Sequence, residues 1–197
     1  MNKHLPILLA FISAALFGSA SPASKVLLNS FAPIQLAGLL YLGAAIGVMP
    51  LMLKNKEIKL PTHLSNRNRF YLLGAIVCGG IIAPIFLLLG LQFASASSVS
   101  LWLNLELVAT AILGYCFFHD HLGRIGWIGV AGCIIAAILL SAGEGVAGIE
   151  AALLVTIACI AWGLDNHLTA LIDGISPAQS TFYKGIVAGS INLLLGI

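Results

Sequence analysis

Charged residues are scarce in this chain: they make up 8% of its 197 residues, whereas 60% are hydrophobic. The mean hydropathy is +1.06. A soluble domain of this length needs far more polar surface, so the composition predicts a protein that folds in lipid. The sequence also lacks a basic face with interleaved aromatic side chains. That absence argues against nucleic acid as a partner.

Cysteine is equally sparse, and its placement fits neither a disulfide framework nor a zinc site. The four cysteines fall singly inside apolar stretches, without a CxxC pair, and are expected to be small core residues. The sequence holds no HExxH motif, glycine-rich phosphate loop or nucleotide fingerprint. We therefore expect no catalytic residues, no metal and no cofactor, and a protein that is not an enzyme.

One short cluster leaves a metal site open as an alternative. Cys116, His119, Asp120 and His121 lie close together in the sequence. His119 and His121 are two residues apart at a helix end, a spacing that does not place them on one helical face. A juxtamembrane loop with titratable side chains is the favoured interpretation, and an intramembrane metalloenzyme is the alternative.

Seven apolar stretches approach the roughly 20 residues that a helix needs to cross a bilayer. They cover residues 5–27, 33–53, 70–90, 94–118, 125–142, 149–171 and 178–197. The loops between them are short except for the one at 54–69. The sequence therefore predicts an all-α, polytopic transmembrane bundle of about seven spans.

Basic residues predict the orientation of this bundle. The 54–69 loop opposes a single acid, Glu57, with the basic residues Lys54, Lys56, Lys59, Arg67 and Arg69. Such a loop is typically cytoplasmic, and alternation puts the N-terminus on the same side. We expect an integral protein of the inner or plasma membrane with a cytoplasmic N-terminus. The first span also resembles a signal peptide, but its apolar run continues past the small residues at 18–21, which disfavours cleavage.

The sequence starts to repeat itself in its second half. Ala-Leu-Phe-Gly at 15–18 matches Ile-Ala-Trp-Gly at 160–163, and Pro-Ile-Gln at 33–35 matches Pro-Ala-Gln at 177–179. Gly18 and Gly163 lie 145 residues apart, and the two prolines lie 144 apart. The second copy begins five predicted spans after the first begins. An odd number of crossings reverses the direction of the chain, so the two copies run oppositely through the membrane.

These copies therefore predict inverted repeats, a design in which a site near the midplane opens alternately to each side. We expect residues 1–145 to form the first five-helix repeat. Residues 146–197 are then the first two helices of an incomplete second repeat.

With these motifs in view, the chain resembles the EamA-like transporters of the drug/metabolite transporter superfamily. In the first two spans, the similarity rests on residues 15–19 with Pro22 and Lys25, and on residues 33–35. In the fourth and fifth spans, it rests on residues 94–98 leading to Asn104-Leu105-Glu106, and on Gly126, Gly129 and Gly132. Residues 162–169 resemble the opening helix of the second repeat. The three glycines lie on consecutive helical turns and suit tight packing. The resemblance implies ten helices in the full form, of which this chain holds about seven.

Two departures from the family pattern carry expectations of their own. Leu107 stands where members often have proline, which predicts a straighter fourth helix. His119 and Asp120 stand where many members have a Gly-Glu pair.

The resemblance and the repeats together predict a secondary transporter that exports or exchanges a small polar metabolite by alternating access. Its partners would be that substrate and the lipid bilayer. The alternative is a non-transporting or partial membrane subunit that needs another chain to supply the missing helices. Two GxxxG pairs, Gly43/Gly47 and Gly185/Gly189, favour packing within the bundle and leave a homodimer as the alternative.

Glu106, near the middle of the fourth span, is the first candidate for substrate binding or coupling. An ionised acid at that depth costs about 2.5–3.5 kcal/mol on insertion scales, so it must face a polar cavity, pair with a cation or stay protonated. Helical spacing puts Trp102 and Thr110 on its face and Asn104 elsewhere, so Asn104 and Glu106 are not expected to line one narrow pocket. Asn104 is a candidate either for a ligand contact or for a hydrogen bond between helices.

The sixth span supplies the second group of candidates. Trp162, Asp165, Asn166 and Thr169 follow helical spacing and predict one polar and aromatic stripe, with His167 beside it. We expect Asp165, Asn166, Trp102 and Trp162 to line the path of the substrate. A solvated helix end is the alternative.

Three further residues complete the candidates. Pro22 removes a backbone donor and is expected to kink the first helix, exposing carbonyls for a ligand or an ion. Lys25 and Lys184 lie near the ends of their spans, where each either snorkels toward the lipid headgroups or neutralises an acidic substrate.

Overall fold

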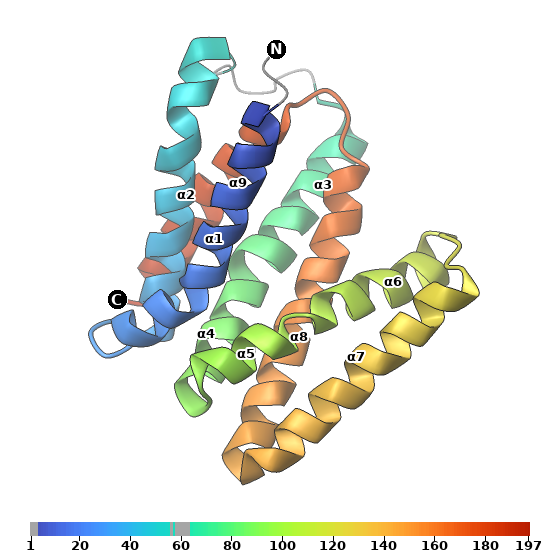
Figure 1. The fold of residues 1–197 in the computed structure, drawn as a ribbon. Coiled ribbons are helices and arrows are strands. Elements are labelled where there is room, and N and C mark those ends of the chain that lie inside the picture. The colour runs from blue at the N-terminus through green and yellow to red at the C-terminus, as the bar shows by residue number, and fades with distance from the viewer. Residues whose placement is uncertain (1–3, 56, 58–63) are drawn as a thin grey trace.

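The computed structural model describes residues 4–55, 57 and 64–197, and all regular structure in that part of the chain is helical. The elements are α1 (His4–Leu27), α2 (Pro33–Asn55), α3 (Asn66–Ala75), η1 (Ile76–Ile82), α4 (Ala83–Phe93), α5 (Ala96–Trp102), α6 (Leu105–Phe117), α7 (Arg124–Gly143), α8 (Gly145–Ala170) and α9 (Pro177–Leu195). Figure 1 shows α1 beginning, α2 ending and α3 beginning at one end of the bundle, as alternating spans require.

Six helices in the described residues are long and apolar enough to cross a membrane: Pro6–Leu27, Pro33–Asn55, Asn66–Phe93, Ala96–Phe117, Arg124–Gly143 and Gly145–Ala170. The seventh predicted span is α9, which lies alongside α2. The prediction of an all-α polytopic bundle is thus confirmed. Of the basic residues used to orient it, Lys56 and Lys59 lie outside the described residues.

The third span runs without a break from α3 through η1 to α4, but η1 is wound as a π-helix. The backbone N–H of Ala83, which follows η1, donates to the carbonyl of Cys78, five residues back instead of four. Apolar periodicity does not register such an insertion, so the sequence predicted a regular helix here. π segments inside α-helices frequently lie at functional sites.

The fourth span, expected to be straighter than is usual in the family, is interrupted. α5 ends at Trp102, and α6 restarts at Leu105. The Asn104 side chain donates to the carbonyl of Leu101 at 2.9 Å, and the backbone N–H of Leu107 bonds to Asn104, only three residues back. Asparagine competes in this way with helical hydrogen bonds, so the span turns without the proline that the family often carries.

α2 and α9 pack closely and antiparallel through small residues. A Cβ at Gly38 would lie 2.7 Å from the backbone nitrogen of Leu193, and a Cβ at Gly185 would lie 2.7 Å from the carbonyl oxygen of Tyr41. Residue numbers thus rise along one helix as they fall along the other. Such close approach of two backbones needs glycine at the contact.

The other glycine patterns do not all serve packing. Gly189 also touches α2, so the Gly185/Gly189 pair packs within the bundle as predicted. A Cβ added at Gly43 or Gly47 would meet no atom of the described residues within 4 Å, and the same holds for Gly129 and Gly132 of α7. The expectation of tight packing by the α7 glycines is therefore wrong for these two positions.

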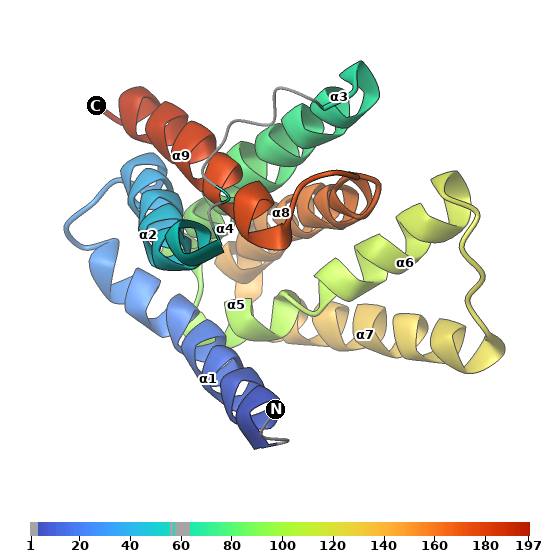
Figure 2. The ribbon, with the colours of Figure 1, turned by 90° about the horizontal axis from the view of Figure 1, so that it is seen from above.

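α8 lies at the centre of the bundle. It packs against α4, α6, η1, α3 and α7, as the view from above shows (Figure 2). Its residues Ala151, Val155 and Cys159 join Leu36 and Trp102 in the main hydrophobic core.

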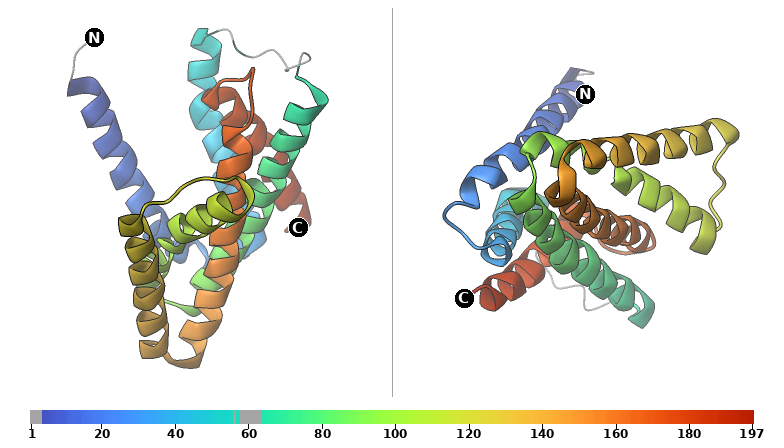
Figure 3. Two further views of the ribbon diagram at one scale, coloured as in Figure 1. Left: turned by 90° about the vertical axis from the view of Figure 1, so that its right-hand side faces the viewer. Right: turned by 90° about the horizontal axis from the view of Figure 1, so that it is seen from below.

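The first and fifth spans lie at the periphery. α7 contains no buried residue, and α1 contacts α5 and α4 while the rest of it diverges from the bundle (Figure 3). In an 18-residue apolar stretch of α1, 11% of the residues are buried, whereas in such a stretch of α8 the buried share is 33%.

Candidate functional site

A cavity of about 340 Å³ lies between α1, α2, α4, α6 and α8. Its walls are mostly leucine and aromatic side chains, among them Phe17, Tyr41 and Trp162, and Glu106 lines it as well. A second cavity of about 350 Å³ adjoins the first and shares Phe17, Ser21 and Glu106 with it. These volumes lie at the small end of the roughly 300–1,000 Å³ found for small-molecule sites.

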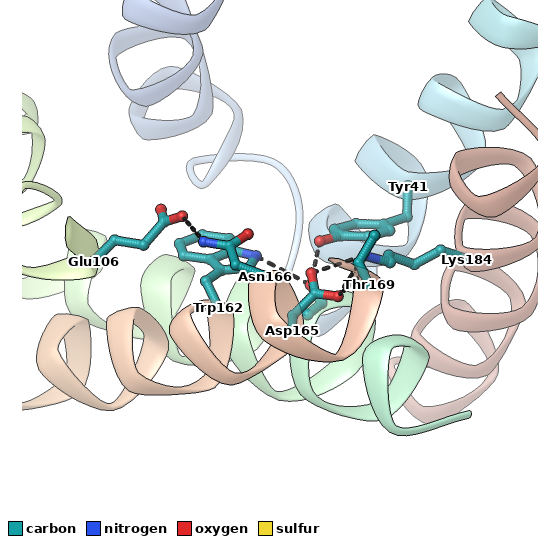
Figure 4. Close-up of polar contacts among 8 residues, drawn as sticks. Tyr41, Glu106, Trp162, Asp165, Asn166, Thr169 and Lys184 are labelled. Atoms are coloured by element: carbon teal, nitrogen blue, oxygen red, sulfur yellow. Dashed lines mark hydrogen bonds and ion pairs between the residues drawn. The ribbon is translucent and has the colours of Figure 1, made fainter. Parts of the chain in front are cut away.

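Glu106 is half-buried and hydrogen-bonded to the sixth span. Asn166 Nδ2 donates to Glu106 Oε1 at 3.0 Å and approaches Thr110 Oγ1 at 3.4 Å. Figure 4 shows this contact reaching from α8 across to α6. Glu106 and Thr110 therefore share one helical face, as their spacing predicted. Among the described residues no cationic side chain forms an ion pair with Glu106.

Asp165, on the same helix as Asn166, lies in a very different environment. It is buried, and Lys184 Nζ of α9 contacts both of its carboxylate oxygens, at 2.6 and 2.7 Å. Thr169 Oγ1 donates to Oδ1 at 2.9 Å. The missing side chain of Gly79 makes room for this group, since a Cβ there would overlap the carboxylate. Asp165 thus forms an ion pair with Lys184 inside the protein and does not line either cavity.

The π segment offers a backbone carbonyl to the side chains around the first cavity. Pro84 has no N–H, and the N–H of Ala83 donates to the carbonyl of Cys78. Neither residue can therefore donate to the Gly79 carbonyl. The Tyr41 hydroxyl and Trp162 Nε1 donate to this carbonyl instead, the latter at 3.1 Å. Two aromatic rings are thereby held in the wall of the cavity.

A second carbonyl of η1 is bonded in the same way. Asn192 of α9 is fully buried and donates from Nδ2 to the carbonyl of Gly80 at 2.9 Å. Neither Tyr41 nor Asn192 is among the site residues predicted from the sequence. A signal for both was present, because each is a polar side chain within an apolar span, and a Gly-Gly pair followed by Pro84 marks carbonyls that lack helical donors.

The break in the fourth span changes the predicted positions of two candidates. Asn104 and Glu106 line the second cavity together, so the expectation that they could not share a pocket is wrong. Trp102 is fully buried in the hydrophobic core and lines neither of the two cavities. Both predictions assumed an unbroken helix, whereas residues 103–104 form a turn between α5 and α6.

The candidates in α1 also differ from expectation. Pro22 is exposed and lines neither cavity, whereas its neighbours Ser21 and Ser24 line the first. Lys25 Nζ donates to the carbonyls of Leu91 and Gln92, at 2.6 and 3.2 Å, at the C-terminal end of α4. A cation there satisfies carbonyls that have no helical partner, and Lys25 lines neither cavity.

His167 links α8 to the end of α6. Its Nε2 lies 2.9 Å from the carbonyl oxygen of Thr110, and its ring stacks on Phe118 with centroids 4.2 Å apart. Its Nδ1 lies 3.9 Å from Asp120 Oδ2. Within residues 4–55, 57 and 64–197 no three His, Cys, Asp or Glu side chains gather as they would around a metal ion, and the 116–121 cluster is no exception.

Fold and site together define a polytopic membrane protein with a half-buried acid facing a cavity between its spans. The model of the EamA-like transporter family matches residues 4–142, and the chain belongs to this family. It is also 28% identical to an uncharacterized transporter of Methanothermobacter thermautotrophicus. That match covers 96% of the chain, which spans 62% of the length of the relative. No solved structure matches the chain.

Proposed function

We propose that the chain is part of a secondary transporter that moves a small polar metabolite across the membrane by alternating access. One observation carries this proposal: Glu106 lies at the middle of a span, forms no ion pair with a cation in the described part of the chain, and faces two adjoining cavities. An intramembrane acid of this kind by default belongs to a substrate or ion pathway. In the proposed mechanism Glu106 binds the substrate or the coupling ion, and Asn166 and Thr110 orient its carboxylate.

We propose further that the movement uses two inverted repeats, residues 1–145 and the part of a second repeat in 146–197. In that scheme α9 is the counterpart of α2, and their antiparallel packing is what an inverted pair requires. α8 is the counterpart of α1. Its close packing on the third and fourth spans suggests that α1 would pack in the same way on the corresponding spans of a complete second repeat.

A topology experiment tests the repeats and the orientation. The scheme puts the N-terminus in the cytoplasm of an inner or plasma membrane and the turn at Glu144 on the other side. Reporter tags placed before His4 and at Glu144 should therefore be accessible from opposite compartments. Access from the same compartment would remove the inversion and with it the basis for alternating access.

Transport itself is tested with the chain reconstituted in proteoliposomes. Glu106→Gln should abolish flux or uncouple it from the driving ion, because the amide keeps the hydrogen bond from Asn166 but removes the charge. Asn166→Ala should weaken transport less, since it leaves the charge in place. Undiminished flux with unchanged pH dependence in Glu106→Gln would take this residue out of the mechanism.

A second candidate is a partial subunit that requires helices from another chain or from a second copy. The exposed faces of α1 and α7 favour it, because neither span is covered as the central helices are. Purifying the native complex in mild detergent and counting its chains decides between the two. A stable and active single chain excludes the partial subunit.

A further inference from the structure

The charges around the two cavities are unbalanced, and the imbalance has one sign. Among the described residues that line them, Glu106 is the one charged side chain. The spans also hold two lysines, but the amino groups of both bond other partners. Lys184 contacts both oxygens of Asp165, and Lys25 bonds two carbonyls at the end of α4. The cavities therefore present an uncompensated negative charge.

The walls of the first cavity supply the hydroxyls of Ser21 and Ser24 as neutral hydrogen-bonding groups, and among the described residues they supply no cation to balance this charge. Its lining is dominated by leucine side chains and by the rings of Phe17, Tyr41 and Trp162. The polar atoms of Tyr41 and Trp162 both donate to the Gly79 carbonyl, so these residues present rings and not donors to a ligand. Ring faces attract cations through the quadrupole of the π-system, with the largest effect for tryptophan.

We propose that the first cavity binds an organic monocation, an amine with an apolar or aromatic body. The ammonium group contacts the carboxylate of Glu106, and the body packs against the leucines and the aromatic rings. The inference rests on the proposed function, because it names the substrate class of the same site. Anionic metabolites such as phosphate esters fit this cavity poorly, since a second negative charge buried beside Glu106 would leave both uncompensated.

Equilibrium binding to the 197-residue chain in lipid nanodiscs tests this class directly. Three radiolabelled probes share one phenylalkyl body and differ in charge: 2-phenylethylammonium, the neutral 2-phenylethanol and the anion 3-phenylpropanoate. We expect the cation to bind at least about tenfold more tightly than the alcohol, as for a hydrogen bond to a charged group, and the anion to bind most weakly. Equal affinity for the cation and the alcohol, or tightest binding of the anion, overturns the proposal.

Two matched variants test whether the preference for the cation comes from Glu106. Glu106→Gln should reduce the preference for the cation by about tenfold while the affinity for the alcohol stays unchanged, so the alcohol also reports whether the cavity is intact. Glu150→Gln makes the same chemical change at an exposed position of α8 that lines neither cavity and should keep the preference. If Glu106→Gln does not fold, Glu106→Asp replaces it and should retain the sign of the preference. A preference that survives in Glu106→Gln, or disappears in Glu106→Asp, contradicts the proposal.

Binding and flux are measured separately, so the two proposals can fail separately. A chain that binds the cation through Glu106 but moves no solute across liposomes keeps the inferred ligand class and refutes transport. A chain that carries a neutral or anionic metabolite and does not prefer the cation keeps transport and refutes the ligand class.

Discussion

Glu106 and Asp165 are both acids inside apolar spans, yet their surroundings differ in almost every respect. Asp165 is buried and contacts Lys184 through both oxygens, whereas Glu106 is half-buried, accepts a hydrogen bond from Asn166 and faces a cavity. The charge of Asp165 is compensated inside the protein, and that of Glu106 is not. We infer that the first acid serves stability and that the second is left for a ligand.

The backbone around the two acids also differs, because one acid lies in a continuous helix and the other beside an interruption. Asp165 lies within an uninterrupted helix and packs against Gly79 of the π segment, where three spans meet. Glu106 lies just after the turn between α5 and α6, near the start of a restarted helix. A site at an interrupted helix has more freedom to rearrange than one inside a continuous helix, and the proposed alternating access would use that freedom.

The largest effect is expected from breaking the compensated pair. Lys184→Met should lower the free energy of unfolding by about 3–5 kcal/mol, because it leaves Asp165 buried without a counter-charge. Equilibrium unfolding in mixed detergent micelles measures the change. The double variant Asp165→Asn/Lys184→Met removes both charges and should recover most of the loss. A loss of less than about 1 kcal/mol in the single variant would contradict a stabilising role for the pair.

The next effect comes from filling the space beside Asp165. Gly79→Ala places a Cβ where the carboxylate lies, so the acid must move away from Lys184. We expect a loss of about 1–3 kcal/mol, as for other insertions into packed sites. Gly43→Ala is the matched control, because a Cβ there meets no atom within 4 Å. It should be neutral or stabilising by up to about 1 kcal/mol, and an equal loss in both variants would refute the role of Gly79.

Sequence patterns predicted the spans well and the interruptions poorly. All seven predicted apolar stretches are helical, because length and hydropathy alone suffice to define a span. The π segment and the turn at 103–104 lie beside single residues, Pro84 and Asn104, that hardly alter the mean hydropathy of their spans.

The same distinction holds for the candidate site. The pairing of Glu106, Thr110 and Asn166 follows from helical spacing within α6 together with the contact between α6 and α8. Neither the ion pair of Asp165 with Lys184 nor the bonding of Tyr41 to the Gly79 carbonyl could be predicted, because each joins two spans whose relative rotation is set by packing. Periodicity shows which residues share a face and leaves open what that face contacts.

A smaller effect is expected at Lys25, a cation that is compensated by carbonyl groups instead of an acid. Lys25→Met removes the donor to the last carbonyls of α4 and should cost about 0.3–1 kcal/mol, as is usual for charges at a helix end. Hydrogen exchange should increase near Gln92 more than elsewhere. A loss of binding at the first cavity would instead assign Lys25 to the ligand.

The smallest effect on stability is expected at Glu106 itself. Glu106→Gln should change the free energy of unfolding by no more than about 0.5 kcal/mol, because the amide oxygen still accepts the hydrogen bond from Asn166 and no buried cation loses its partner. Asp165→Asn, the same substitution at the other acid, strands Lys184 and should cost several times more. Parallel unfolding measurements on the two variants compare the acids directly. If Glu106→Gln proved as destabilising as Asp165→Asn, the carboxylate of Glu106 would have a structural partner and would not be available to a ligand.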